Sequence, residues 1–358
     1  MYFGLTDEQL MMQDTVRSVL ESECPPLTIL EQLKTTAEMV GPWSTLSEMG
    51  VPGLIASEDL GGAGFELLDA ALVAEVGGEG ALPGPLLGHQ LAMLAIIGGG
   101  SDEQKERWVP SLASGERVGT IAWAEPGDRW DPNSWTVRIE NDRLHGKKVH
   151  VPAPAPSGLV VAGTAPGGLA VIDDASTGVE FRDFDGIDRT RPLVEMRFDG
   201  AVAEVLPGGP DAANRLRDAG CVLLAADAFG CASRIMRETI DYLSEREQFG
   251  TRLTQFQGIK HELADMAVEL EPTRALWWYA AHALDHIPDE GPRVAAIAKA
   301  AIGDRAMRIA RACVDLHGAI GYAWETPIHL WYKRIMFDRA FLGGSGYHRD
   351  RAAELAAW

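Results

Sequence analysis

The sequence has no run of more than two adjacent lysine or arginine residues, and its 52 acidic residues outnumber its 32 basic ones, giving a net charge of -20. So acidic a chain repels nucleic acid and anionic membrane surfaces over most of its area. Nucleic-acid binding is therefore disfavoured. An anionic ligand such as a dinucleotide or a CoA ester would need a few well-placed arginines.

Long hydrophobic runs and paired cysteines are also missing. The N-terminal segment MYFGLTDEQL has neither the basic region nor the apolar stretch of a signal peptide. Apolar stretches such as residues 91–100 are too short and too rich in glycine to span a bilayer. The four cysteines (Cys24, Cys221, Cys231 and Cys313) contain no C-x-x-C pair. We therefore expect reduced, buried thiols in a cytoplasmic protein, no metal site and no membrane partner.

The hydrophobic periodicity divides the 358 residues into three segments. Residues 1–118 have helical spacing, with Thr6 and Ser101 placed as the caps of two helices, which predicts an N-terminal helical domain. Residues 119–209 predict a small antiparallel β domain, a sandwich or a barrel, because they contain seven short β-rich runs. Residues 210–358 return to helical spacing with many small residues, as in a helical bundle. The predicted strands cover residues 118–123, 136–139, 144–151, 159–162, 169–172, 179–184 and 193–198.

Several motifs are spread along the whole chain: LTDEQ and GVPGLIASEDLGGAG near the start, AWAEPG at 122–127, EREQFGTRLTQFQGIKHELADM at 245–266 and DLHGAIGY at 315–322. Together they resemble the acyl-CoA dehydrogenase family. HGAIGYAWE and FLGGSGYHRDR are most similar to its actinobacterial branch, which handles bulky acyl-CoAs such as steroid side-chain thioesters. The resemblance implies a mostly α fold with a central β domain, made of an N-terminal helical domain, a small antiparallel β sandwich or barrel, and a C-terminal four-helix bundle.

The resemblance also implies a reaction and a cofactor. In the family, a carboxylate removes the α-proton of an acyl-CoA while a hydride leaves the β-carbon for FAD, and the protein holds all three in one dry geometry. FAD is expected at a subunit interface, with its flavin ring against the β domain of one chain. Its adenosine diphosphate end is expected on the C-terminal helices of a neighbour. Electron-transfer flavoprotein is the implied electron acceptor.

The elements that bind the adenosine end in the family are mostly present. Arg246 offers a fixed cationic fork for pyrophosphate oxygens. Phe249 lies on the following turn, and Gln257 matches the glutamine that contacts FAD in the family. Gly318 permits close approach of the backbone to a diphosphate. Asp315 departs from the family, which usually has glutamine there, and its carboxylate would repel phosphate, so this side chain either weakens the site or contacts something else.

Structural roles remain open for several of these side chains. Arg246 could instead pair with Glu245 or Glu247, and the glycines could simply turn the chain. His317 and His261 have no obvious acidic partner, and we interpret both as structural histidines rather than ligands.

The elements that meet the flavin ring in the family are altered. The family has a tryptophan and a hydroxyl residue after its NGxK motif, where this chain has His150 and Pro152. Proline has no backbone N–H and cannot donate a hydrogen bond to the ring. The family's TEPGAGSD loop is replaced by AEPGDRWDP, which lacks the glycine–serine turn. We therefore expect this half of the site to be degraded.

Neither of the two positions that carry the catalytic glutamate in the family holds an acid. In the C-terminal loop the equivalent residue is Gly343, and on the first long C-terminal helix it is Gly220. Asp227, two turns further along that helix, is a candidate base, although a capping or packing role is favoured because its side chain is one methylene short. The arginine that contacts CoA in the family corresponds to about Cys221.

Three hypotheses follow. The leading one is a subunit of a heterotetrameric acyl-CoA dehydrogenase that contributes contacts to the adenosine end of FAD, while a homologous chain supplies the base. The second is a self-sufficient homo-oligomeric dehydrogenase with a base that we cannot place. The third is a scaffold, or a flavoprotein of the same fold with another activity.

Overall fold

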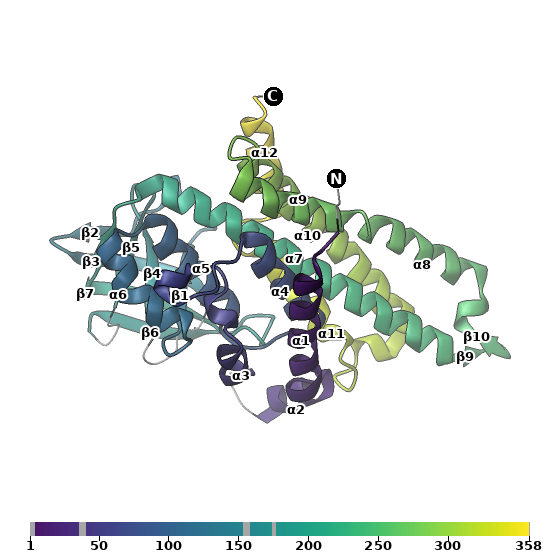
Figure 1. Cartoon of the computed structure of the whole chain (residues 1–358). Helices are drawn as coiled ribbons and strands as arrows, with labels where there is room; N and C mark the ends of the chain where they lie inside the picture. Colours follow the sequence, from purple (N-terminus) through teal and green to yellow (C-terminus); the bar gives the residue numbers. More distant parts are fainter. Residues whose placement is uncertain (1–3, 36–40, 153–157, 174–176, 358) are drawn as a thin grey trace. The chain divides into compact units, whose positions relative to one another are not determined.

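The structure is a computed structural model, and it describes residues 4–35, 41–152, 158–173 and 177–357 (Figure 1). The chain forms two compact units, each discontinuous in sequence. Unit 1 consists of Met1–Ala37, Ala71–Leu82 and Cys221–Trp358, and unit 2 of Glu38–Ala70 and Pro83–Gly220. The secondary structure changes type where the first strand begins at Gly119 and where a long helix begins at Gly209. The division into three domains at 118 and 209 stays a prediction.

Unit 2 contains short helices and most of the strands. Ser101 caps its helix α6 in a capping box, because its hydroxyl accepts the N–H of Gln104 while the Gln104 side chain accepts the N–H of Ser101. This confirms the predicted helix start. The helical elements are α3 (Trp43–Glu48), η1 (Val51–Gly53), η2 (Glu58–Leu60), α5 (Leu86–Gly99), α6 (Asp102–Ala113) and η3 (Pro132–Ser134). Helices α4 (Leu67–Glu79) and α7 (Gly209–Glu245) begin in unit 2 and end in unit 1.

Two four-stranded sheets make up the β region of unit 2. Their strands are β1 (Gly119–Ala122), β2 (Arg138–Glu140), β3 (Arg143–Pro152), β4 (Leu159–Thr164), β5 (Gly168–Ile172), β6 (Val179–Phe184), β7 (Leu193–Val202) and β8 (Glu204–Leu206). One sheet has the order β1-β4-β5-β8 and the other β2-β3-β7-β6. All seven predicted strands are present, and β8 was not predicted.

The expectation of purely antiparallel sheets needs one correction. Strands β1 and β4 pair in parallel, with Gly119 opposite Leu159, while the other pairs of both sheets are antiparallel. The chain leaves the first sheet after β1, builds β2 and β3 in the other sheet, and returns through β4 in its original direction. A buried apolar cluster joins residues from both sheets, including Val160 of β4 and Met196 of β7, so the two sheets form a sandwich.

The described residues of unit 1 are helical apart from one hairpin. Its elements are α1 (Asp7–Glu23), α2 (Pro26–Thr35), β9 (Glu247–Gln248), β10 (Thr251–Arg252), η4 (Leu253–Gln255), α8 (Gln257–Leu270), α9 (Thr273–His286), α10 (Gly291–His317), η5 (Gly318–Tyr322), α11 (Ile328–Ala340) and α12 (Ser345–Leu355). Thr6 caps α1 in a capping box with Gln9, as its sequence predicts. The mostly helical chain with a β region in its middle confirms the expected fold class.

Helices α4 and α7 approach closely within unit 1, because glycines face the neighbouring backbone. A methyl group on Gly230 would lie 1.9 Å from the carbonyl oxygen of Glu75, and one on Gly78 would lie 2.1 Å from that of Asp227. Any side chain at either position would force the two helices apart. These contacts fix the position of Asp227 along α7 relative to α4.

Among the described residues, α7 is the one helix that is both long and apolar enough to cross a membrane by length and composition. An 18-residue window of this helix has a mean hydropathy of 1.4. The sequence analysis did not identify this apolar helix. However, 83% of that window is buried in the protein, as in an ordinary core helix, so the finding is weak evidence for a span. The four cysteines are free and buried, in agreement with the sequence.

Candidate functional site

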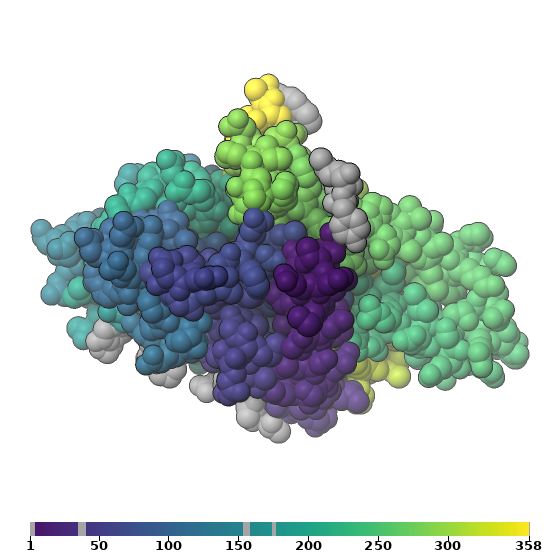
Figure 2. Space-filling model, in the orientation of Figure 1, coloured from purple at the N-terminus to yellow at the C-terminus, as the bar shows by residue number. Residues whose placement is uncertain are grey.

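The hairpin of β9 and β10 carries two of the predicted binding residues. Gln248 pairs with Thr251, and the two residues between them, Phe249 and Gly250, have φ values of 55° and 80°. Positive φ at both positions is the geometry of a tight hairpin turn, and it is unusual for phenylalanine. Phe249 is 95% exposed. The segment that forms the hairpin lies at the right of the view in Figure 2, at the surface of unit 1. So large an exposed aromatic ring is suited to contact something outside the chain.

Arg246, just before this hairpin, points its charge to solvent. Its side chain is exposed and forms no ion pair or hydrogen bond within the described residues, so the alternative pairing with Glu245 or Glu247 is not observed. Arg252, on the return strand, is likewise exposed and has no ion pair among the residues that the structure covers. On a chain with a net charge of -20, two unpaired arginines on one hairpin form a local site for an anion.

The end of α10 lies beside the end of α7. The ring of His317 stacks on that of Tyr242 with centroids 4.5 Å apart and an interplanar angle of 14°. A His317 ring nitrogen, Nδ1, lies 2.8 Å from the carbonyl oxygen of Cys313. His317 is therefore a packed and hydrogen-bonded side chain. The stack places the hairpin that follows α7 and the turn that follows α10 at the same end of unit 1.

That turn exposes bare backbone. Gly318 has φ of 64° and ψ of -142°, and a methyl group built on it would meet nothing within 4 Å. Gly321 is the opposite case, because a methyl group there would lie 2.5 Å from the carbonyl oxygen of Val314. Asp315 is exposed and accepts a hydrogen bond of 2.8 Å from the hydroxyl of Tyr322. That hydrogen bond raises the pKa of Tyr322. Gln257, the first residue of α8, is exposed.

The residues at the expected flavin-ring position of unit 2 contact one another. His150 has φ of 55° and sits at an irregularity in the pairing of β3 with β7, between Lys148 and Val151. Its ring stacks on Trp130 with centroids 5.9 Å apart and an angle of 11°, and it meets Phe184 edge-on at 4.7 Å. Burial lowers the pKa of His150. The position thus holds a stack of the chain's own rings.

Pro152, at the expected hydroxyl position, is buried. Its carbonyl oxygen accepts a hydrogen bond of 2.7 Å from the Thr120 hydroxyl, and its ring lies 3.1 Å from where a methyl group on Gly88 would sit. Pro152 therefore packs between β1 and α5 and offers no donor to a ligand. The residues that follow Pro152, 153–156, lie outside the described residues.

The sequence analysis missed a buried ion pair that involves Lys148, two residues before His150. The Nζ of Lys148 lies 3.1 Å from Oε1 of Glu125, and both side chains are almost fully buried. Glu125 also accepts the backbone N–H groups of Thr136 and Val137, at 2.7 and 2.9 Å. Burial opposes ionisation of Glu125, but the Lys148 charge and these hydrogen bonds outweigh it and lower the pKa of Glu125. Burial lowers the pKa of Lys148 to about 7.

Gly343 occupies a backbone conformation that other residues rarely adopt. Its φ is 104°, and a methyl group built on it would lie 2.6 Å from Cδ1 of Tyr347 and 3.3 Å from Nε2 of His348. Two of the chain's own rings therefore occupy the space that a glutamate side chain would enter.

Gly220 is buried in α7, and the sequence analysis did not weigh an acid two residues before it. Asp218 is 2% exposed, and its Oδ1 lies 3.3 Å from Nε of Arg217. Residues two apart on a helix point to different sides, so Asp218 cannot act in the direction of Gly220. The only sequence signal for Asp218 is its charge at the edge of an apolar helix segment.

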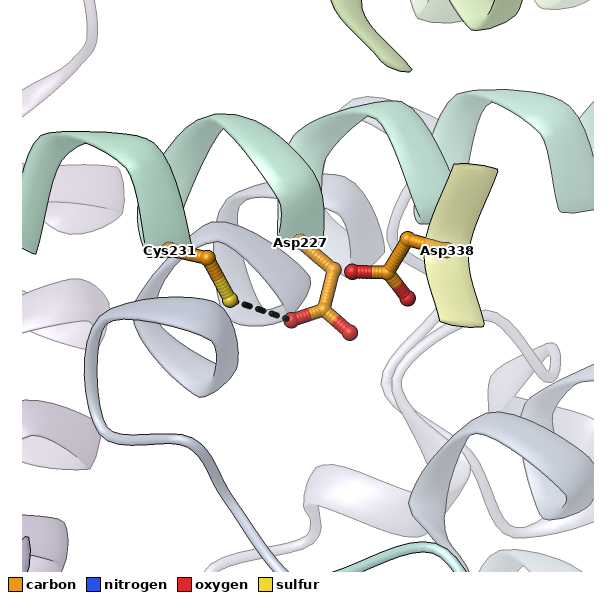
Figure 3. A group of neighbouring side chains, drawn as sticks. All are labelled: Asp227, Cys231 and Asp338. Atoms are coloured by element: carbon orange, nitrogen blue, oxygen red, sulfur yellow. Dashed lines mark hydrogen bonds between the residues drawn. The ribbon is translucent and has the colours of Figure 1, made fainter. Parts of the chain in front are cut away.

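Asp227 is part of a buried group of charges (Figure 3). Ligand-type atoms of Asp227, Cys231 and Asp338 lie within 4.8 Å of one another, which by distance alone would admit a cation. However, Nη1 of Arg334 lies 3.6 Å from Oδ2 of Asp227, and both side chains are buried. Arg334 also donates to the carbonyl oxygen of Leu82 at 2.9 Å. The guanidinium thus already supplies the positive charge that an ion would bring.

Cys221, at the expected position of the CoA-binding arginine, also faces the chain's own side chains. Its Sγ lies 3.6 Å from Nε2 of His348, and that nitrogen is 3.1 Å from the carbonyl oxygen of Leu342. Lys299 is buried nearby on α10 and donates to the backbone oxygens of Asp338 and Arg339. Burial lowers the pKa of Lys299 to about 8. The sequence analysis did not single out His348 or Lys299.

The sequence matches two domain families. Residues 6–116 match the acyl-CoA dehydrogenase N-terminal domain, and residues 209–356 match the acyl-CoA dehydrogenase C-terminal domain. Acyl-CoA dehydrogenase IpdE2 of Mycobacterium tuberculosis is 29% identical over 330 residues, which cover 92% of this chain and 91% of the relative.

Solved structures agree. A variant of the Tcur3481-Tcur3483 steroid ACAD has a TM-score of 0.89, with 30% identity over 98% of each chain. The ChsE4-ChsE5 complex from Mycobacterium tuberculosis has a TM-score of 0.88 over 100% of this chain and 99% of that one, and its 24% identity shows the fold alone. Family members are FAD-dependent oxidoreductases that act on acyl-CoA. Since the two domain families cover more than half of its residues, the chain belongs to the acyl-CoA dehydrogenase family.

Proposed function

We propose that this chain is the non-catalytic subunit of a heteromeric acyl-CoA dehydrogenase for bulky substrates such as steroid side-chain CoA esters. It binds the adenosine diphosphate end of FAD with Arg246, Phe249, Gln257 and Gly318. A homologous chain supplies the catalytic base and the surface for the flavin ring. We further propose a cytoplasmic location, supported by four free, buried thiols.

One observation carries the proposal: Gly343 has φ of 104° and faces Tyr347 and His348. At the second position for a base, Gly220, the nearby Asp218 points to another side of α7 and lies beside Arg217. Asp227 is ion-paired with Arg334. Removal of an α-proton needs a positioned carboxylate, and displacement by about 1 Å costs on the order of 100-fold. Among the described residues, neither family position therefore offers a positioned carboxylate to take the proton, which supports a base on another chain.

The residues at the end of unit 1 fit the adenosine diphosphate end of FAD. Arg246 holds an unpaired fork that can donate two parallel hydrogen bonds to phosphate oxygens. Gly318 lets a diphosphate approach the backbone, and Phe249 offers an exposed face to the adenine or ribose. The ring position does not fit in the same way, because the His150 and Trp130 rings stack on each other and Pro152 lacks an N–H. Bound FAD supplies the hydride acceptor of the reaction.

The similar proteins support the choice of substrate and partner. The Tcur3481-Tcur3483 protein is a steroid ACAD named for two components, and its structure is 30% identical in sequence to this chain. The acyl-CoA dehydrogenase FadE34 of Mycobacterium tuberculosis is 31% identical over 87% of this chain, which spans 41% of that relative. Electron-transfer flavoprotein remains the proposed electron acceptor.

The test is the visible spectrum of the purified chain, alone and co-expressed with a homologue that has an intact glutamate. We expect colourless protein alone and a yellow complex that is bleached by a bulky acyl-CoA. Yellow protein that is bleached by acyl-CoA without any partner would establish the self-sufficient enzyme instead. Yellow protein that ignores acyl-CoA but consumes oxygen would indicate a different flavin activity.

A further inference from the structure

Two histidines lie one turn apart near the end of α9, a helix of unit 1. Of the nine histidines in the sequence, only His282 and His286 are four residues apart. Residues at this spacing lie on the same side of a helix, with their Cβ atoms about 5–6 Å apart. Both side chains are exposed. The two imidazole rings are therefore neighbours at the surface of unit 1.

The separation of these rings matches the separation that a shared metal ion would impose. Their centroids are 4.5 Å apart, and their planes are inclined at 37°. A transition-metal ion binds an imidazole nitrogen at about 2.0–2.1 Å, which places the ion about 3.2 Å from the ring centre. Two imidazoles at right angles on one ion then have their centres about 4.5 Å apart, whereas tetrahedral angles would separate them by about 5.2 Å. Right angles between ligands are typical of Cu²⁺ and Ni²⁺.

The last turn of α9 is held in place by its own hydrogen bonds and by α10. The N–H of Ile287 donates to the carbonyl oxygen of Ala283 at 2.8 Å, so the helical pattern continues past both histidines. A methyl group on Gly291 would lie 3.0 Å from Cα of Leu284, which brings the start of α10 into close contact with this turn. A turn that is fixed in this way keeps the two rings together before an ion binds, and binding then costs little ordering entropy.

The surroundings of the pair favour a cation. Residues 279–292 contain three acids and no lysine or arginine. His286 lies in the last turn of α9, where the helix dipole has its negative end. The hydroxyl of Tyr279, one turn before the first histidine, donates to Oε2 of Glu290 at 2.6 Å. This hydrogen bond raises the pKa of Tyr279 against the weaker effect of the Arg293 charge, so negative potential prevails on this side of α9.

The contacts of His282 differ from those of a histidine with a structural role. His317 stacks on Tyr242, and its Nδ1 lies 2.8 Å from the carbonyl oxygen of Cys313. His282 forms no hydrogen bond or ion pair with the residues that the structure describes, and the ring that it meets is that of His286. Packing and hydrogen bonding therefore account for His317, whereas they do not account for a second histidine placed beside His286.

We propose that His282 and His286 form a chelating site for a divalent transition-metal ion that takes ligands at right angles, such as Ni²⁺ or Cu²⁺, with water at its other positions. The expectation of no metal site rested on the spacing of the cysteines, which carries no information about a histidine pair. A bound ion links two positions of one helical turn, so it also stabilises the end of α9. The proposal concerns unit 1 alone and does not depend on the proposed function.

The test titrates Ni²⁺ into the untagged, chelator-treated chain by isothermal titration calorimetry. We expect one ion per chain and no competition from Mg²⁺, which prefers oxygen ligands. His282→Ala and His286→Ala should each raise the dissociation constant on the order of 100-fold, because the second ligand of a chelate binds intramolecularly. His261→Ala, at an exposed histidine of α8, is the matched control and should bind like the wild type.

Three outcomes overturn the proposal. They are a chain without saturable Ni²⁺ binding, binding that is indifferent to both substitutions on α9, and two ions per chain of which each substitution removes one. Circular dichroism of each variant checks that helix content is unchanged.

Thermal unfolding provides a second measurement. Ni²⁺ should raise the Tm of the wild type and of His261→Ala, but not that of His282→Ala or His286→Ala. An equal rise in all four proteins would place the ion elsewhere and contradict the proposal. The flavin spectrum of a co-expressed complex tests the proposed function separately, so failure of one leaves the other standing.

Discussion

The β9–β10 hairpin of unit 1 exposes its charged and aromatic side chains, whereas the region around His150 in unit 2 pairs such side chains with one another. At the hairpin, Arg246 and Arg252 have no ion pair among the described residues, and Phe249 is 95% exposed. In unit 2, His150 stacks on Trp130, and Glu125 forms a buried ion pair with Lys148. Groups left unsatisfied at a surface are available to a ligand, whereas groups that satisfy one another inside the chain are not. The contrast separates a region suited to binding from one that supports only the chain itself.

The same contrast applies to the acids of the chain. A catalytic carboxylate must reach substrate, but Asp227 is 1% exposed and lies 3.6 Å from Arg334. Asp227 therefore resembles the paired groups of unit 2, because its carboxylate is buried and ion-paired within the chain. Five tests would break or sharpen this comparison.

The largest expected effect is on stability, from Asp227→Asn. The change leaves the Arg334 guanidinium buried without its counter-charge, and breaking a buried ion pair in this way costs about 3–5 kcal/mol. Urea unfolding measures it, with Asp241→Asn, exposed on the same helix, as the control. Turnover of folded, assembled protein should stay within a few-fold of normal. A loss of more than about 1000-fold with intact folding would show that Asp227 is the base.

The next largest effect distinguishes two adjacent glycines. Gly343→Ala should lower the free energy of unfolding by about 2 kcal/mol, because φ is 104° and Tyr347 lies in the way. Gly344→Ala should change it by less than about 0.5 kcal/mol, since φ is -78° and nothing lies within 4 Å.

Gly343→Glu extends this test to function. The new carboxylate meets the rings of Tyr347 and His348, so we expect no gain of dehydrogenase activity from the isolated chain. An active Gly343→Glu protein would mean that the loop still admits a base and that only the acid is missing.

A smaller effect concerns cofactor retention. Arg246→Ala should weaken FAD binding by the assembled complex by about 1.5–3 kcal/mol, the value of a charge-assisted phosphate contact. Arg252→Ala, the other unpaired arginine of the hairpin, is the matched control and should cost less. Flavin content after gel filtration measures both. If Arg246→Ala leaves the FAD content unchanged, Arg246 has a structural role. The hairpin is then not shown to be a binding region.

The smallest effect is the titration of His150. Burial lowers its pKa, although the charges of Asp128 and Glu195 oppose this. An unfolded histidine titrates near 6.5, so the unfolded chain binds this proton more readily than the folded one, and stability should fall as the pH drops below about 6.5. An NMR titration of the ring should give a value below 6.5. A value at or above it would mean that the stack is open to water.

The fold was largely predictable from the sequence, because periodicity reports local structure directly. The capping boxes at Thr6 and Ser101 and the seven β-rich runs need only neighbours within a few residues. The parallel pairing of β1 with β4 was missed, because it depends on how the chain returns between two sheets. The hairpin of β9 and β10 was also missed, since two-residue strands leave no periodic signal.

The candidate site was predictable only in its residue types. Sequence could identify Arg246 and the missing glutamates, but it could not show that Arg246 is unpaired or that Tyr347 crowds Gly343. Glu125 and Lys148 are 23 residues apart in the sequence, and no short sequence pattern predicts their ion pair. Such contacts depend on tertiary packing between segments that are distant in the sequence. A pattern within a few neighbouring residues therefore does not predict them.

The discontinuity of unit 1 has a consequence for synthesis on the ribosome. Unit 2 ends at Gly220, so all of it has been translated while Cys221–Trp358 is still to come. Carbonyl oxygens at Glu79 and Leu82 receive their hydrogen bonds from Trp331 and Arg334, 252 residues further along the chain. Helix α4 and the residues that follow it therefore keep apolar surface exposed until α11 has been synthesised, and we expect them to be segments that chaperones bind.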